Sequence, residues 1–172
     1  MTFAQKLGPG YEAVRSAARI KTIKVNLNDA ECELKVRIPV KREMEELTAS
    51  IAVPESALVE KIYNDLAAPL RKTLDESGDG FLEAINEDEE RIKITDNDVI
   101  VSGTSVRQMA QFTAIWQKQV EAYFALLQSP TGEPINESFE VISDEFPEAV
   151  IKEIVTKIDG AIRPNYKEAK KN

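Results

Sequence analysis

The stretch TSVRQMAQFTAIWQKQVEAYFALLQ, residues 104–128, has the clearest structural pattern in the chain. Its apolar residues recur every three or four positions, which places them along one side of an α-helix. Thr104 or Ser105 can cap the first turn, and Pro130-Thr131-Gly132 ends the pattern. The apolar stripe comprises Val106, Met109, Phe112, Trp116, Val120, Tyr123 and Leu127, widened by Ile115, Phe124 and Leu126. We therefore predict a long amphipathic helix at about 104–128.

Two other parts of the chain have the alternation that is typical of β-hairpins. The runs RIKTIKVNL (residues 19–27) and CELKVRIPV (residues 32–40) flank the turn-forming Asn28-Asp29-Ala30. The second hairpin, IKITDNDVIV (residues 92–101), has Asp96-Asn97-Asp98 at its turn. We predict that the two hairpins form a small antiparallel sheet.

Three further segments have apolar residues at helical spacing. The first runs from Met44 to Ile51, the second from Leu58 to Leu74 and the third from Val150 to Ile158. Pro69 should kink or split the second helix, because proline lacks an N–H donor and clashes with the preceding turn. Together with the long helix, these segments predict four to five helices and an α+β fold.

The predicted organisation has three parts: a flexible N-terminal segment or one small helix at 1–18, a single α+β domain at 19–163, and a flexible tail at 164–172. A hinge is predicted near 86–91. A chain of 172 residues is long enough to bury a core without disulfides or metal. Its only cysteine, Cys32, lies between two acidic residues, which disfavour a reactive thiolate, so we interpret it as structural.

Composition excludes several classes of partner. The chain has 22 Lys and Arg residues against 30 Asp and Glu residues, a net charge of −8. Such a charge repels nucleic acid and anionic membranes, so we expect neither as a ligand. No apolar run approaches the ~18 residues of a membrane span, and the N-terminus lacks the apolar core of a signal peptide. We expect a protein of the cytoplasm.

Residues that are needed for common active sites are missing. The chain has no histidine, the commonest general base and metal ligand, and a single cysteine cannot form a thiolate zinc site. Neither of the glycine-rich phosphate-binding motifs occurs. We therefore predict no catalytic residues, no cofactor and no metal, and expect the chain to act by binding other proteins.

Residues 75–86 match part of the pattern of a calcium-binding EF-hand loop. Asp75, Ser77, Asp79 and Glu83 provide oxygens at loop positions one, three, five and nine. Asn86 stands where the loop requires a bidentate glutamate, and Glu87 is one position out of register. The simpler interpretation is a helix end followed by an exposed turn, with a calcium-responsive module as the alternative.

The long helix also supplies the candidate partner-binding residues. Phe112, Trp116, Tyr123 and Phe124 concentrate aromatic side chains in a chain with only 6% aromatic residues. Large aromatic side chains dominate contact energies both in cores and at interfaces. The stripe therefore indicates either a buried core face or a surface that receives a partner helix or another subunit.

The run VKREMEELTASIAVPESALVEKIYNDL, followed by ITDNDVIVSGTSVRQMAQFTAIWQKQVEAYFALLQSPTGEPI, resembles tail assembly chaperones of long, non-contractile-tailed bacteriophages. The resemblance covers roughly residues 20–160 and rests on paired β-segments followed by the long helix. It implies a non-enzymatic protein of the host cytoplasm that binds the tape-measure protein and helps to recruit the tail-tube protein. Such proteins coat the apolar helices of the tape measure and leave before the tail is complete.

Two further expectations accompany this resemblance. Many members of the family also exist in a longer form that is made by ribosomal frameshifting, and Lys170-Lys171-Asn172 could be encoded by a slippery A-rich run. Self-association, alone or with such a longer form, is a related expectation. The alternative function is a structural virion component, such as a minor tail or head–tail joining protein.

Overall fold

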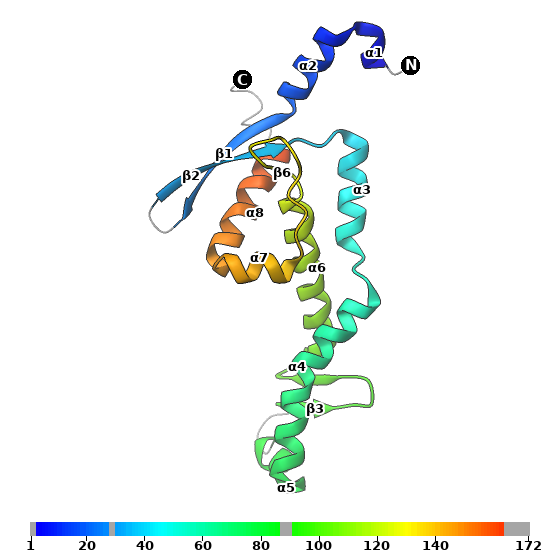
Figure 1. The fold of residues 1–172 in the computed structure, drawn as a ribbon. Coiled ribbons are helices and arrows are strands. Elements are labelled where there is room, and N and C mark those ends of the chain that lie inside the picture. Colours follow the sequence, from blue (N-terminus) through cyan, green and yellow to red (C-terminus); the bar gives the residue numbers. More distant parts are fainter. Residues whose placement is uncertain (1–2, 28–29, 87–90, 164–172) are drawn as a thin grey trace. The chain divides into compact units, whose positions relative to one another are not determined.

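The computed structural model describes residues 3–27, 30–86 and 91–163, which form helices and short antiparallel strands (Figure 1). The helices are α1 Phe3–Leu7, α2 Pro9–Ala18, α3 Lys41–Ala52, α4 Ser56–Ser77, α5 Asp79–Ile85, α6 Val106–Phe124, α7 Phe139–Glu145 and α8 Glu148–Ile162. The strands are β1 Ile20–Leu27, β2 Ala30–Arg37, β3 Ile92–Ile94, β4 Val99–Val101, β5 Thr104–Ser105 and β6 Leu127–Gln128. The α+β class, both hairpins and the long helix are confirmed.

The chain divides into two compact units. Unit 1 comprises Met1–Ala49 and Gln119–Asn172, and unit 2 comprises Ser50–Lys118. Helix α6 begins in unit 2 and ends in unit 1. The single domain predicted at 19–163 stays a prediction. The unit boundaries do not fall at the hinge predicted near 86–91, of which residues 87–90 lie outside the described residues.

The sheet of unit 1 has the strand order β1-β2-β6 and is antiparallel throughout. In the β1–β2 ladder, Ile23 pairs with Leu34 and Val25 with Cys32, so these four side chains share one face of the sheet. Ile23 and Val25 are buried while Lys24 and Asn26 are exposed, which confirms the alternation read from the sequence. The first hairpin therefore presents an apolar face to the rest of unit 1.

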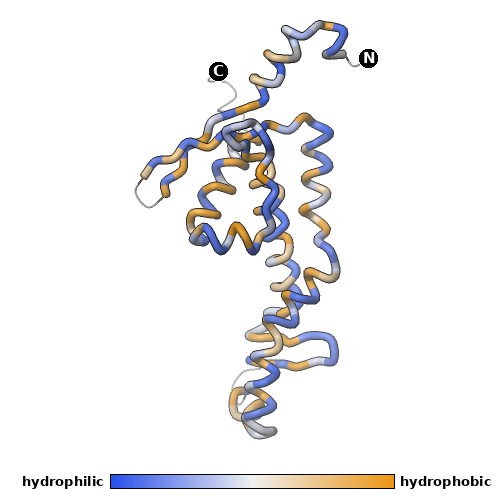
Figure 2. The backbone as a smooth tube through the Cα atoms, viewed as in Figure 1, coloured by the Kyte–Doolittle hydropathy of each residue, from blue (hydrophilic) through white to orange (hydrophobic). Residues whose placement is uncertain are grey.

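Helix α8 covers this apolar face (Figure 1). Its buried residues fall at helical spacing and give the helix one apolar side, visible as alternating orange and blue in Figure 2. Two polar contacts add to the packing: Lys21 Nζ donates to the Ala161 carbonyl at 3.2 Å, and the Asn26 N–H donates to Glu153 Oε1 at 3.2 Å. The buried residues of α8 are Ile151, Ile154, Val155, Ile158 and Ala161.

Unit 2 has its own core and its own sheet, with the order β3-β4-β5. The two predicted hairpins thus belong to separate three-stranded sheets and not to one. Each sheet gains a third strand of two residues, β6 in unit 1 and β5 in unit 2. Two residues are too few to show an alternation of apolar and polar side chains. Such short strands form where a neighbouring strand offers an unpaired edge, so the sequence pattern does not reveal them.

Two local predictions need correction. Residues 3–7 and 9–18 form helices α1 and α2, with Pro9 at the first position of α2, where its missing N–H costs nothing. The split predicted at Pro69 does not occur, since α4 runs without interruption from Ser56 to Ser77. The kink, the other predicted effect of Pro69, stays a prediction. Because proline has no N–H, the Asp65 carbonyl one turn earlier lacks its usual helical donor. Pro69 and Asp65 are both exposed, so a water molecule can donate to this carbonyl instead. The tail at 164–172 lies outside the described residues.

None of the helices within residues 3–27, 30–86 and 91–163 is both long enough and apolar enough to span a bilayer.

Packing of α8 should account for much of the stability of unit 1. Ile158 is fully buried, so Ile158→Ala should lower the free energy of unfolding by about 2–5 kcal/mol through lost burial and the cavity left behind. Urea denaturation followed by circular dichroism measures this change. The neighbouring exposed Lys157→Ala is the control and should shift it by less than about 0.5 kcal/mol. Equal effects of the two changes would contradict the assignment of α8 to the core.

Candidate functional site

One side of α6 is fixed by its packing in the core of unit 2. Val106, Ala110 and Ala114 lie one helical turn apart and are 3%, 0% and 0% exposed. They belong to one apolar cluster with Ile62 and Ala67 of α4. Alanine side chains let two helix backbones approach closely, so this side of α6 has little freedom to turn outward.

The opposite side of α6 carries large apolar side chains. Successive residues of a helix are rotated by about 100°, which places Met109, Phe112 and Trp116 far around the helix from Ala110 and Ala114. Phe112 is 62% exposed and Met109 45% exposed, and Trp116 is partly buried. We call these three residues the apolar face of α6. Neighbouring exposed apolar side chains of this kind can mark a surface that binds another protein.

The other two predicted partner-binding residues have a different location. Tyr123 and Phe124 belong to unit 1 and are only 1% and 3% exposed. The Tyr123 hydroxyl donates to Asp159 Oδ1 at 2.6 Å, and the Phe124 ring lies tilted against the Phe146 ring with their centroids 6.1 Å apart. Burial and this hydrogen bond raise the pKa of Tyr123 above its ordinary value. Both side chains therefore serve the core and are not available to a partner in this structure.

Asp98, at the turn of the second hairpin, holds the start of α6. Its Oδ1 accepts from the backbone N–H of Val99 at 2.8 Å and of Arg107 at 3.0 Å, and its Oδ2 accepts from the Ser105 hydroxyl. Ser105 Oγ in turn accepts from the Gln108 N–H at 3.0 Å, which confirms the predicted serine cap. The turn predicted at 96–98 is also confirmed, since it links β3 to β4.

Electrostatics of this cap favour the charged carboxylate. Burial, the largest influence, would raise the pKa of Asp98, but it is outweighed by the hydrogen bonds from Ser105, Arg107 and Val99 and by the charge of Arg107. The pKa of Asp98 is consequently lowered below its ordinary 3.8. The charge also interacts favourably with the positive end of the helix dipole.

Arg107 ties the same end of α6 to α4. Its guanidinium lies over the Tyr63 ring, 4.1 Å from the centroid, and forms an ion pair with Glu60. Its Nε also donates to the Asn97 carbonyl at 3.0 Å. A side chain held by an ion pair, a ring and a carbonyl fixes the position of the helix to which it belongs.

A shallow pocket of about 320 Å³ lies beside these residues, within unit 2. Val53, 78% exposed at the end of α3, is the most exposed of its apolar residues. No sequence pattern indicates a role for this residue, because Val53 stands next to Pro54 in an irregular connection. The pocket is lined by Ala52, Val53, Pro54, Ser56, Val59, Glu60 and Gln111.

The segment compared with a calcium loop is mostly helical. Asp75 and Ser77 lie in the last turn of α4, and Asp79 to Ile85 form α5, so these residues do not form one continuous binding loop. Glu87 lies outside the described residues. Within the part of the chain that the structure describes, no group of three or more acidic, cysteine or histidine side chains is arranged to hold a metal ion.

Comparisons with protein-family models, with curated proteins and with solved structures find no match to this chain. The exposed residues of α6 and the surrounding contacts therefore carry the functional argument.

The cap at Asp98 has a testable pH dependence. Asp98→Asn should lower the free energy of unfolding by about 1 kcal/mol at about pH 7, because the charged acceptor of the helix N-terminus is lost. A lowered folded-state pKa stabilises the protein above the unfolded-state pKa, and this contribution is lost as the pH falls through the folded-state value. Urea titrations should therefore show the gap between wild type and variant closing as the pH falls below the ordinary aspartate pKa.

As a control, Asp96→Asn at the exposed start of the same turn should change stability at about pH 7 by less than about 0.5 kcal/mol. A gap between wild type and Asp98→Asn that stays constant with pH would rule out the carboxylate charge as its cause.

Proposed function

We propose that this chain is a tail assembly chaperone of a phage with a long, non-contractile tail, and that it binds the tape-measure and tail-tube proteins in the host cytoplasm without catalysis. The observation that carries the proposal is Phe112, 62% exposed on a helix whose opposite side is fixed in a core. The resemblance in residues 20–160 names the class of partner.

The chemistry of this surface suits an apolar helix. Met109, Phe112 and Trp116 follow one another at three- and four-residue steps, so their side chains form a continuous strip along α6. A partner helix with apolar residues at the same spacing can lie along such a strip. A tape-measure protein exposes helices of this kind before the tail tube encloses them.

The charge of the chain suits the same role. A net charge of −8 makes copies of the chain repel one another. A complex of this chain with an apolar helix would inherit that repulsion, which opposes aggregation while the apolar surfaces are covered. Binding and charge together would keep the tape-measure protein available for assembly.

Phe112 provides the sharpest test of the proposed binding face. Phe112→Ser should weaken capture of the tape-measure protein of the same phage by about tenfold or more, since exposed aromatic residues are frequent hot spots. Co-purification from cells that express both proteins measures this effect. The melting temperature of the variant alone should stay within a few degrees of wild type, because Phe112 contributes little to the core.

Val141→Ser is the matched control, because Val141 is 45% exposed on α7 and is not part of the apolar face. It should leave capture unchanged. Unchanged capture by Phe112→Ser would refute α6 as the binding surface. Capture lost equally in both variants would indicate that general surface hydrophobicity is responsible.

A second test addresses the alternative function. A chaperone leaves before assembly ends, whereas a minor tail or head–tail joining protein remains in the particle. Mass spectrometry of purified virions should therefore detect the tube protein and no stoichiometric amount of this chain. Its presence at a fixed copy number per particle would favour the structural alternative.

A further inference from the structure

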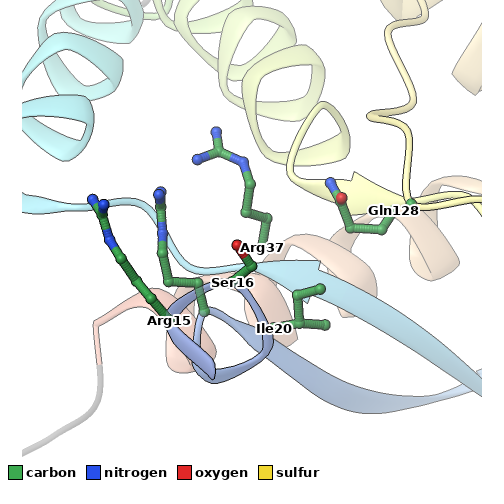
Figure 3. A pocket seen from close by; sticks show the side chains of 7 residues that line it. Arg15, Ser16, Ile20, Arg37 and Gln128 are labelled. Carbon is green, nitrogen blue, oxygen red and sulfur yellow. The ribbon is translucent and has the colours of Figure 1, made fainter. Parts of the chain in front are cut away.

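Unit 1 contains a pocket of about 370 Å³ in which arginine side chains predominate (Figure 3). Arg15 and Arg19 come from the end of α2 and the residue that follows it, and Arg37 comes from the end of β2. Gln128 of β6 and Ile20 of β1 also line the pocket, together with Ser16 and Gly132. Figure 3 shows Arg15, Arg37 and Gln128 extending their polar ends towards the same side of the sheet. Residues far apart in sequence thus supply one cluster of donors.

Glu43 holds two of the three arginines in place. Its Oε2 accepts from Arg37 Nη1 at 2.9 Å, from the Val40 N–H at 2.9 Å and from Arg19 Nη2. The Arg19 Nε also donates to the Ile38 carbonyl at 3.0 Å. Burial alone would raise the pKa of Glu43, but these hydrogen bonds and the two guanidinium charges lower it, so the anchor stays ionised.

The anchor leaves binding capacity unused. Each guanidinium has about five N–H donors. Among the described residues, Ile38 and Glu43 take up two donors of Arg19, and Glu43 takes up one donor of Arg37. Among the described side chains, three arginines line the pocket and the Glu43 carboxylate pairs with two of them, which leaves two positive charges in excess. In a chain with a net charge of −8, this is a local reversal of sign. An anion is the ligand that such a pocket attracts.

The other side chains that line the pocket favour one kind of anion over another. Guanidinium groups bind carboxylates through two parallel hydrogen bonds, and the Gln128 amide can donate to or accept from a peptide group. Ile20 is 40% exposed and offers apolar contact that a bare inorganic anion cannot use. The combination suits a carboxylate that belongs to a peptide with a neighbouring apolar side chain.

We propose that the pocket formed by Arg15, Arg19, Ile20, Arg37 and Gln128 binds an acidic peptide segment of a partner protein. The pocket lies wholly in unit 1, whereas the apolar face of α6 lies in unit 2, so the proposal does not depend on the tape-measure proposal. It adds a second, electrostatic binding site to the chain.

The test uses the whole chain and a short fluorescein-labelled peptide in which glutamate and leucine alternate. Fluorescence anisotropy should show binding that weakens with added salt, because exposed charges are screened. Arg15→Gln should weaken it by about tenfold, the effect of losing one charge-assisted contact. Arg15 is the residue of choice because it takes no part in the Glu43 anchor.

Three controls accompany the measurement. Arg42→Gln removes the same charge from an exposed site on α3 outside the pocket and should leave affinity unchanged. The Phe112→Ser variant should bind the peptide as wild type does. A peptide in which glutamine replaces glutamate should bind at least about tenfold more weakly.

Four results would overturn the proposal. The first is equal affinity for the glutamate and glutamine peptides, and the second is an equal loss of affinity in Arg15→Gln and Arg42→Gln. The third is displacement of the labelled peptide by inorganic phosphate as efficiently as by unlabelled peptide, and the fourth is Arg15-dependent self-association in sedimentation equilibrium without peptide binding. The third would identify a site for a bare oxyanion, and the fourth would identify a second copy of this chain as the occupant.

Discussion

The rotation of α6 about its own axis is the constraint on which the proposed binding face depends. Ala110 and Ala114 are completely buried in the core of unit 2, where a larger side chain would overpack the cluster. Once this side is fixed, helical periodicity directs Phe112 away from the core. The exposed phenylalanine is thus a consequence of how two alanines pack, and its position is as rigid as that packing.

Polar contacts reinforce this constraint at the helix start, beside the buried Val106. Asp98 satisfies the N–H of Arg107, and the Arg107 side chain reaches back to the Asn97 carbonyl of the same turn. The hairpin and the helix therefore hold each other through reciprocal contacts over about ten residues of sequence. In unit 1, Glu43 plays a role like that of Asp98, since its carboxylate forms ion pairs with Arg19 and Arg37, which are far apart in sequence.

Periodicity predicted the elements better than their assembly. The alternation in 19–40 and the stripe in 104–128 identified a hairpin and a helix, because both patterns are local consequences of burying one face. The same stripe could not reveal that Phe112 is exposed while Tyr123 is buried, since different neighbours cover the two ends of α6. The arginine pocket was equally hidden, because it unites side chains from residues 15–20, 37 and 128.

The continuity of unit 2 has a consequence for synthesis on the ribosome. Unit 2 is one uninterrupted segment, Ser50–Lys118, whereas in unit 1 Val36 of β2 pairs with Leu127 of β6, 91 residues later in the chain (127 − 36). Closing so long a loop is slow compared with forming local contacts. When residue 118 has been added, every element that packs within unit 2 has been translated. At that point α8, which packs on β1, has not yet been translated. The apolar face of the first hairpin therefore stays without its covering helix until α8 has been synthesised.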